Sequence, residues 1–276
     1  MKKVAVTGAF DDIRSGDVRL LQAAAKLGQV QVLLPADETI RDLEGREPKF
    51  PQEERRYLMQ AIRYVNEVPP VRDWENRDSL PAGSFQQPDI WVVGEAEDNP
   101  LKRAKAAVRG VDYQVIKDEE LPDLSGGQAR ADWTSGDGLA RKKVMVTGCF
   151  DWFHSGHVRF FEEVSELGDL YVVVGHDENV RLLKGDGHPM FNQDERRYMV
   201  GAIRYVRQAL ISSGHGWLDA EPEFARVRPD IYAVNEDGDK PEKRVFCEEQ
   251  GIEYVVLKRL PKPGLPKRES TALRGF

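Results

Sequence analysis

Two histidines three residues apart are the side chains of this sequence best suited to chemistry. His154 and His157 stand in GCFDWFHSGH, residues 148–157, directly after the apolar run Val144–Thr147. The residues that follow have the apolar spacing of a helix. A glycine turn, two imidazoles and a helix start would therefore meet at the end of a strand. Such a place attracts anions, and histidines donate hydrogen bonds to phosphate oxygens. The pattern predicts a phosphate site.

Two other interpretations of the histidine pair remain open. The pair could bind a metal ion, although no third ligand stands at a suitable spacing, or it could cap a helix without any chemistry. A dinucleotide-binding fold is not indicated, because the G-x-G-x-x-G pattern is absent. Gly148 and Gly156 would let the main chain approach a ligand closely, which favours the phosphate interpretation.

The sequence is a tandem repeat. VTGAFDDIRSGDVRL at residues 6–20 matches VTGCFDWFHSGHVRF at 146–160, and EERRYLMQAIRYV at 53–65 matches DERRYMVGAIRYV at 194–206. A period of about 140 residues is too long for a solenoid unit and indicates two homologous domains.

We expect these domains to span residues 1–137 and 138–276, with a linker rich in glycine and serine near their boundary. In the second copy, apolar runs and helical patterns alternate: strand 144–147, helix 156–167, strand 170–175, helix 193–206, strands 209–214 and 230–235, helix 241–251 and strand 253–258. This alternation predicts an α/β fold with a doubly wound parallel sheet in each domain. Ligands of such sheets lie beyond the carboxyl ends of the strands.

Composition and charge exclude several classes of protein. The formal net charge of -7 argues against general binding of nucleic acid or of a membrane surface, which usually needs a basic excess. No apolar stretch approaches the roughly 20 residues needed to span a bilayer. Cys149 and Cys247 stand far apart, which fits a reducing cytoplasm and indicates neither a disulfide framework nor a thiolate zinc site.

The histidine segment resembles the G-x-F-D-x-x-H-x-G-H signature of cytidylyltransferases in the HxGH nucleotidyltransferase superfamily, at every fixed position. VRLLKGDGHPMFNQDERRYMVGAIRYV, residues 180–206, resembles the family's lysine loop and its E-R and R-Y-V helix. ESTALR, residues 269–274, resembles the S-T-x-x-R stretch near the end of the family's domain. The motifs keep the family's order across residues 142–276, which implies the Rossmann-like fold of that superfamily.

The resemblance implies a role for each matching residue. His154 and His157 would hold the phosphates of a nucleoside triphosphate and stabilise the transition state, while Lys184 would bridge the phosphates of both substrates. Asp237 would read the base by accepting a hydrogen bond from a cytosine amino group. The full set of implied nucleotide contacts is Thr147, Gly148, Cys149, Phe150, Asp151, Gly156, Asp237, Ser270, Thr271 and Arg274.

The implied reaction transfers CMP from CTP to a small phosphorylated alcohol or amino alcohol and releases pyrophosphate. A phosphate oxygen of the acceptor would attack the α-phosphorus in line, so that catalysis is positioning and charge stabilisation. Mg²⁺ would bridge the phosphates, held mainly by the nucleotide and water rather than by protein ligands. Two alternatives remain: an ATP-dependent adenylyltransferase of the same superfamily, and a non-catalytic nucleotide-binding scaffold. The family's arginine before S-T is displaced, and Lys267 or Arg268 would replace it.

The first copy lacks the residues to which the resemblance gives chemistry. Arg14 and Asp17 replace the histidines, and Glu44 replaces Lys184. Two carboxylates facing a triphosphate would repel it, yet the strands and the R-Y-V segment persist. We expect residues 1–137 to be a non-catalytic domain that packs on the active one as an intrachain pseudo-dimer, or a regulator that binds another ligand. A homodimer of the chain is also open.

Overall fold

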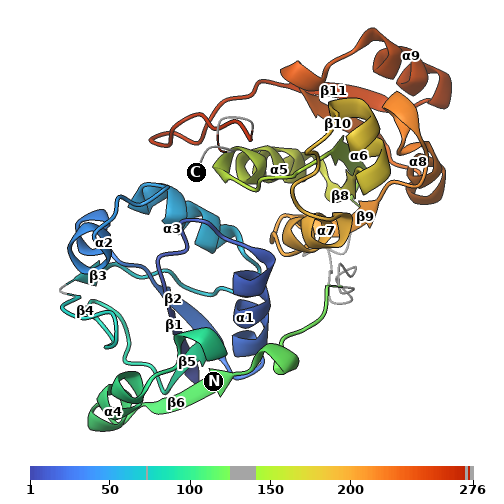
Figure 1. The fold of residues 1–276 in the computed structure, drawn as a ribbon. Helices are drawn as coiled ribbons and strands as arrows, with labels where there is room; N and C mark the ends of the chain where they lie inside the picture. Colours follow the sequence, from blue (N-terminus) through green and yellow to red (C-terminus); the bar gives the residue numbers. More distant parts are fainter. Residues whose placement is uncertain (73, 125–140, 271–272, 274–276) are drawn as a thin grey trace. The chain divides into compact units, whose positions relative to one another are not determined.

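The computed structural model describes residues 1–276 except 73, 125–140, 271–272 and 274–276. The chain divides into two compact units, Met1–Asp123 and Leu124–Phe276, each with its own parallel sheet (Figure 1). The predicted boundary at 137/138 lies outside the described residues. No helix in the described part of the chain is long and apolar enough to cross a membrane.

The second unit is built on a five-stranded sheet in which every pair of neighbouring strands is parallel. Its strands, in the order in which they lie in the sheet, are β11 (Glu253–Leu257), β10 (Ile231–Asn235), β7 (Lys143–Gly148), β8 (Asp169–Val174) and β9 (Val206–Ile211). Its helices are α5 (Ser155–Leu167), α6 (Asp177–Lys184), α7 (Gln193–Gly201), α8 (Glu221–Val227) and α9 (Pro241–Gln250), with short 3-10 turns η3 (Gly216–Leu218) and η4 (Glu236–Gly238). The chain order reverses between β7 and β10, which is the place where doubly wound sheets bind ligands.

The first unit has the same plan, with one strand fewer in its main sheet. The order of its main sheet is β2 (Gln29–Leu33), β1 (Lys3–Thr7), β5 (Ile90–Gly94) and β6 (Asp112–Ile116). The other elements are α1 (Ser15–Ala25), α2 (Asp37–Glu44), α3 (Gln52–Ala61), the pair β3 (Val71–Arg72) and β4 (Ala82–Gly83), η1 (Glu95–Glu97), α4 (Pro100–Val108) and η2 (Asp118–Glu120). Two Rossmann-like, doubly wound units confirm the predicted fold class.

Proline explains the missing edge strand. Opposite β2, the described chain forms only an isolated bridge between Gln31 and Glu67, where the second unit has the whole of β9. Pro69 and Pro70 follow at once. Proline has no N–H to donate to a strand ladder, so the pairing cannot continue.

Within each unit, apolar side chains of the strands and of the first helix pack into a core. Val144, Met145 and Val146 of β7 are fully buried, and so are Val158 and Phe161 of α5. These two helical positions are three residues apart and therefore lie on one face. The spacing that predicted a helix after the histidines thus reflects packing of α5 on the sheet.

The R-Y-V helix is shorter than predicted. The sequence predicted a helix that continues to Val206. In the structure α7 ends at Gly201, and the chain turns so that Val206 begins β9. Ile203 and Val206 are fully buried, and the N–H of Val206 donates to the carbonyl of Ile203 at 3.0 Å. Because Val206 pairs with Leu170 of β8 at the start of β9, tertiary pairing in the sheet overrides the local helical pattern. Tyr205 consequently lies in a turn.

A buried arginine holds the carboxyl edge of the second sheet together. Arg196 is 1% exposed, and its guanidinium donates to three acceptors. These are the carbonyl of Cys149 after β7 at 2.7 Å, the carbonyl of Phe191 at 2.9 Å and the Asp177 carboxylate at the start of α6 at 2.6 Å. One side chain therefore fixes three segments that the sequence separates.

The first unit has the same arrangement around Arg55, which is 0% exposed. Arg55 donates to the carbonyls of Ala9 and Phe50, both at 3.0 Å, and to the Asp37 carboxylate at 2.7 Å. Since this unit lacks the histidines, the buried arginine serves the fold in both copies.

We predict that Arg196→Ala and Arg55→Ala each lower the free energy of unfolding of their own unit by about 3 kcal/mol or more, because each leaves buried acceptors without a donor. Denaturant unfolding measures the change. Arg181→Ala, at an exposed position of α6, is the control and should change the free energy by less than about 0.5 kcal/mol. An effect of Arg196→Ala no larger than the control's would contradict the assignment.

Candidate active site

Most of the predicted site residues line one cavity at the carboxyl end of β7. The cavity has a volume of about 160 Å³, and its lining residues are Gly148, Cys149, Phe150, Asp151, Trp152, His157, Lys184, His188 and Ser270. Seven of these were predicted from the sequence; Trp152 and His188 were not. The cavity thus unites the G-x-F-D turn, the second histidine, the lysine and the serine of the S-T stretch.

Four predicted residues, Thr147, His154, Gly156 and Asp237, do not line this cavity, and two more lie outside the described residues. Thr147 shares a hydrogen bond of 2.8 Å with the Tyr232 hydroxyl of β10 and does not line the cavity. Thr271 and Arg274 lie outside the described residues. Their predicted contacts with the triphosphate therefore stay predictions.

The turn after β7 has a strained backbone. Phe150 has a φ of 51°, in the left-handed region that a bulky residue rarely adopts. Its ring packs between His157 and Phe161, with centroid distances of 5.3 and 5.1 Å. Phe10, the matching residue of the first unit, has a φ of 49°. The strain is therefore a property of the fold that both copies share, not of the chemistry.

His154 is fully buried and caps the start of α5. Its Nδ1 accepts the N–H of Gly156 at 3.1 Å, so the proton of a neutral ring stands on Nε2. Nε2 lies 3.3 Å from the hydroxyl oxygen of Ser270. A Cβ at Gly156 would lie 2.9 Å from the His154 ring, which explains the glycine between the two histidines.

His157 stacks on His154 with a centroid distance of 3.9 Å. Its Nδ1 is buried and has no hydrogen-bond partner among the residues that the structure describes. A buried polar atom without a partner costs free energy unless a ligand satisfies it. His157 is thus arranged to meet a ligand in the cavity.

Both histidines are held neutral. Burial lowers the pKa of His154 to about 3, and the positive charges of Arg259 and Arg268 act in the same direction. Burial also lowers the pKa of His157 well below its ordinary value, together with His154, Arg259 and Lys184. Neutral imidazoles act on phosphate as hydrogen-bond donors, and the full positive charge comes from the neighbouring cations.

Lys184 is the last residue of α6 and is exposed at the cavity. Asp151, by contrast, serves the loop that follows α6: its Oδ1 accepts the N–H groups of Met190 at 2.8 Å and Phe191 at 3.0 Å. In the first unit Asp11 accepts the N–H of Lys49 in the same way, at 3.0 Å. The aspartate of the signature therefore positions main chain in both copies.

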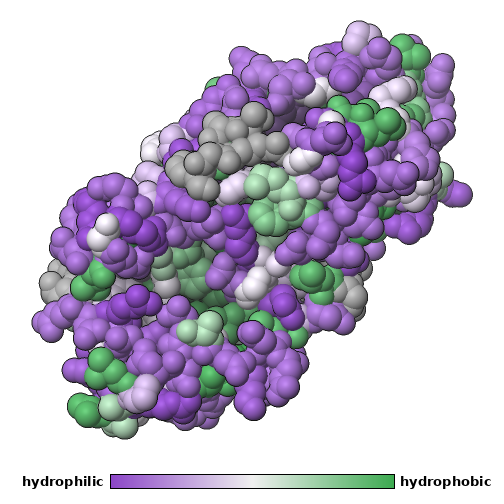
Figure 2. All heavy atoms as spheres, viewed as in Figure 1, coloured by the Kyte–Doolittle hydropathy of each residue, from purple (hydrophilic) through white to green (hydrophobic). Residues whose placement is uncertain are grey.

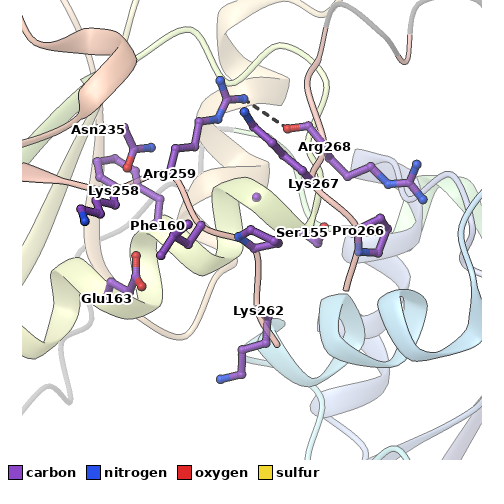
Figure 3. A pocket seen from close by; sticks show the side chains of 13 residues that line it. Ser155, Phe160, Glu163, Asn235, Lys258, Arg259, Lys262, Pro266, Lys267 and Arg268 are labelled. Carbon is purple, nitrogen blue, oxygen red and sulfur yellow. Dashed lines mark hydrogen bonds between the residues drawn. The ribbon is translucent and has the colours of Figure 1, made fainter. Parts of the chain in front are cut away.

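A second, smaller hollow of about 20 Å³ lies between the start of α5 and the segment after β11 (Figure 3). Arg259, two residues after β11, was not among the residues predicted from the sequence. It donates to the Asp237 carboxylate at 2.6 Å and to the carbonyl of Arg268 at 3.2 Å. Asp237, the predicted base reader, is thus paired with an arginine. A cation close after the last strand could have indicated this site residue, but its partner Asp237 is distant in sequence.

In the first unit, charged residues replace the site and bind one another. Arg14 pairs with Asp12 at 2.7 Å, and its main-chain N–H donates to the half-buried Asp17 carboxylate at 2.8 Å. Glu44 pairs with Arg46 at 2.7 Å. Carboxylates stand here where the second unit has His157 and Lys184.

Comparison with known families agrees with this geometry. A family model described as cytidylyltransferase-like matches residues 5–130 and residues 145–256, so both copies are recognised. The chain belongs to the cytidylyltransferase-like family. It is a nucleotidyltransferase enzyme, as the signature indicated.

The chain is similar to several named enzymes. It is 41% identical over 125 residues to the FAD synthase of Aciduliprofundum boonei, which covers 44% of this chain and 80% of that protein. It is 36% identical over 121 residues to the FAD synthase of Methanopyrus kandleri, covering 42% of this chain and 77% of that protein. Similarity to the bifunctional protein HldE of Vibrio cholerae, 37% over 111 residues, covers 38% of this chain and 21% of that protein.

The depressed pKa of His154 predicts a pH dependence of stability. Because His154 is neutral in the folded protein down to about pH 3, only the unfolded chain takes up its proton as the pH falls below about 6.5. Stability is therefore full above about pH 6.5 and falls below it, by about 1.4 kcal/mol per pH unit for this group. His154→Gln should reduce the slope of the unfolding free energy between pH 6 and pH 4 by that amount. Equal slopes in denaturant unfolding of the two proteins would contradict the assignment.

Proposed function

We propose that the second unit transfers a nucleoside monophosphate from a nucleoside triphosphate to the phosphate of a small acceptor. The observation that carries the proposal is the neutral pair His154 and His157, stacked at 3.9 Å beside Ser270 and Lys184 at the carboxyl end of β7. Hydrogen-bond donors and a cation gather there, which suits phosphoryl transfer by positioning.

In this reaction an acceptor phosphate oxygen bonds to the α-phosphorus, the bond from that phosphorus to the bridging oxygen breaks, and pyrophosphate leaves. The histidines donate to the phosphate oxygens on which charge accumulates. Lys184 attracts the phosphates of both substrates, and the N-terminus of α5 adds main-chain donors. Arg259 lies on the lining of the second hollow and adds a cation near the histidines.

Mg²⁺ would accompany the nucleotide. The described residues contain no group of three His, Cys, Asp or Glu side chains that could hold a metal ion. Asp151 is the carboxylate on the lining of the cavity, and its Oδ1 is occupied by two N–H groups. This donor set fits an ion held by phosphates and water, which neutralises part of the charge on the leaving pyrophosphate.

ATP is the donor that we propose. The relatives named FAD synthase support it, because FAD consists of FMN joined to AMP and is built from FMN by adenylyl transfer. CTP is the second candidate: the signature resembles that of cytidylyltransferases, and a carboxylate at Asp237 could accept from a cytosine amino group. The pairing of Asp237 with Arg259 at 2.6 Å counts against this second role.

For the acceptor we propose a phosphate ester with a flat apolar group, and FMN first among them. Leu182 and Leu183 of α6 are 69% and 57% exposed, and Trp217 of the neighbouring η3 is 49% exposed. Hydrophobic atoms are visible at the surface of α6 (Figure 2). Exposed apolar side chains in one place often mark a binding surface. A small phosphorylated alcohol remains the alternative acceptor.

Asn179 holds this apolar surface in place. It is 1% exposed and exchanges two hydrogen bonds with Gly216, at 2.8 and 3.1 Å. These bonds fix η3, and with it Trp217, beside α6. Leu182 and Leu183 follow Asn179 by one helical turn and lie on the same side of α6.

A pyrophosphate-release screen tests the function. ATP and CTP are each offered with Mg²⁺ to FMN and to choline, ethanolamine, glycerol and sugar phosphates. We expect release with ATP and FMN, and loss of about 10²- to 10³-fold in His154→Ala, with an unchanged circular dichroism spectrum. Release only with CTP and a phosphorylated alcohol would establish the second candidate. No release with any pair would favour the scaffold.

We further propose that the first unit is a structural partner of the second, an intrachain pseudo-dimer. It retains AIRYV at residues 61–65, as the second unit does at 202–206, although its chemistry is absent. The fragment 141–276 should therefore self-associate or be poorly soluble, and should be less active than the whole chain. Size-exclusion chromatography and the release assay measure this. A monomeric, fully active fragment would exclude the packing role and leave the first unit as a separate regulator.

A further inference from the structure

The segment between β11 and the S-T stretch, residues 260–270, supplies part of both hollows of the site. Lys262, Lys267 and Arg268 line the second hollow, and Ser270 lines the cavity (Figure 3). The described part of this segment contains no helix or strand. Its position must therefore come from side-chain contacts and not from a backbone ladder.

One end of the segment is held to helix α5 by an ion pair. The Lys262 ammonium contacts both oxygens of Glu162, at 2.7 and 3.0 Å. Glu162 also accepts from Arg159 at 2.9 Å and from the Tyr205 hydroxyl at 3.4 Å. Its side chain is 18% exposed, so the pair is partly shielded from water. Charge-assisted hydrogen bonds in such places are stronger than those on an open surface.

The other end of the segment reaches the first histidine. Arg259 donates to the carbonyl of Arg268 at 3.2 Å, and the Ser270 hydroxyl lies 3.3 Å from His154 Nε2. Helix α5 therefore has two tasks: its start carries the histidines, and Glu162, two turns later, holds the segment that brings Ser270 to them.

The first unit provides an internal comparison. Gln22 stands on α1 where Glu162 stands on α5, within the matching repeats. An amide cannot form the ion pair, and in the first unit β6 is followed by the acidic turn η2 instead of a basic segment. Tyr64, which matches Tyr205, persists. The glutamate thus occurs together with the site and is absent from the copy that lacks it.

We propose that Glu162 is a positioning residue for nucleotide binding: its ion pair with Lys262 seats residues 260–270 so that Ser270 and the neighbouring cations face the triphosphate. This inference rests on the proposed function. Without the pair, the seated state is a smaller fraction of the free protein, and the apparent affinity for nucleotide falls by that fraction. Bound nucleotide restores the seated state, so turnover at saturation changes little.

The first experiment compares Glu162→Gln, which introduces the residue of the first unit, with Lys262→Met and with the control Glu166→Gln at an exposed position of α5. We expect the KM for MgATP to rise roughly tenfold in the first two variants, with kcat within about twofold of the parent. An unchanged KM in Glu162→Gln and Lys262→Met, or a fall in kcat as large as the rise in KM, would overturn the proposal.

The second experiment needs no turnover, so it separates this inference from the proposed function. Limited trypsin digestion of the nucleotide-free chain should cut after Lys267 and Arg268 faster in Glu162→Gln and Lys262→Met than in the parent or in Glu166→Gln. Lys262 precedes proline, where trypsin cuts poorly, so its substitution removes no site. Faster cleavage supports the seating role even if no substrate is found. Equal cleavage rates in all four proteins would overturn it.

Discussion

The structure depends on one buried guanidinium in each unit. A buried guanidinium is costly unless its donors are satisfied. The acceptors that satisfy Arg196 are the carbonyl after β7, the loop before α7 and the carboxylate at the start of α6. These are the segments that surround the cavity. The hydrogen bonds of one arginine therefore fix the carboxyl edge of the sheet, where the nucleotide would bind.

Comparison of the two units separates what the fold needs from what the chemistry needs. The strained phenylalanine, the aspartate that accepts main-chain N–H groups and the buried arginine occur in both. A glycine directly before the second strand also occurs in both units, as Gly28 and Gly168. A Cβ there would lie 2.2 or 2.1 Å from a carbonyl oxygen. The histidines and the lysine occur once. A residue kept in the unit without a site is thus assigned to the fold.

The candidate site places neutral histidines near cations within an acidic chain. Neutral imidazoles would supply directed donors and Lys184 positive charge, while the charge of Arg259 is partly balanced by Asp237. This division is physically consistent, because protonated histidines would be costly to bury next to those cations. In the first unit, carboxylates and arginines at the matching positions neutralise one another. They leave little attraction for a triphosphate.

The sequence by itself determined the duplication, the alternation of strands and helices, and the cavity residues of the signature. These follow from local patterns: apolar periodicity, glycine turns and motif spacing. Tertiary structure alone decided where the R-Y-V helix stops, that Asp237 pairs with Arg259, and that Glu162 holds Lys262. Each of these depends on partners distant in sequence or on burial in the sheet. Such contacts form only when the fold brings the segments together, and no local pattern encodes them.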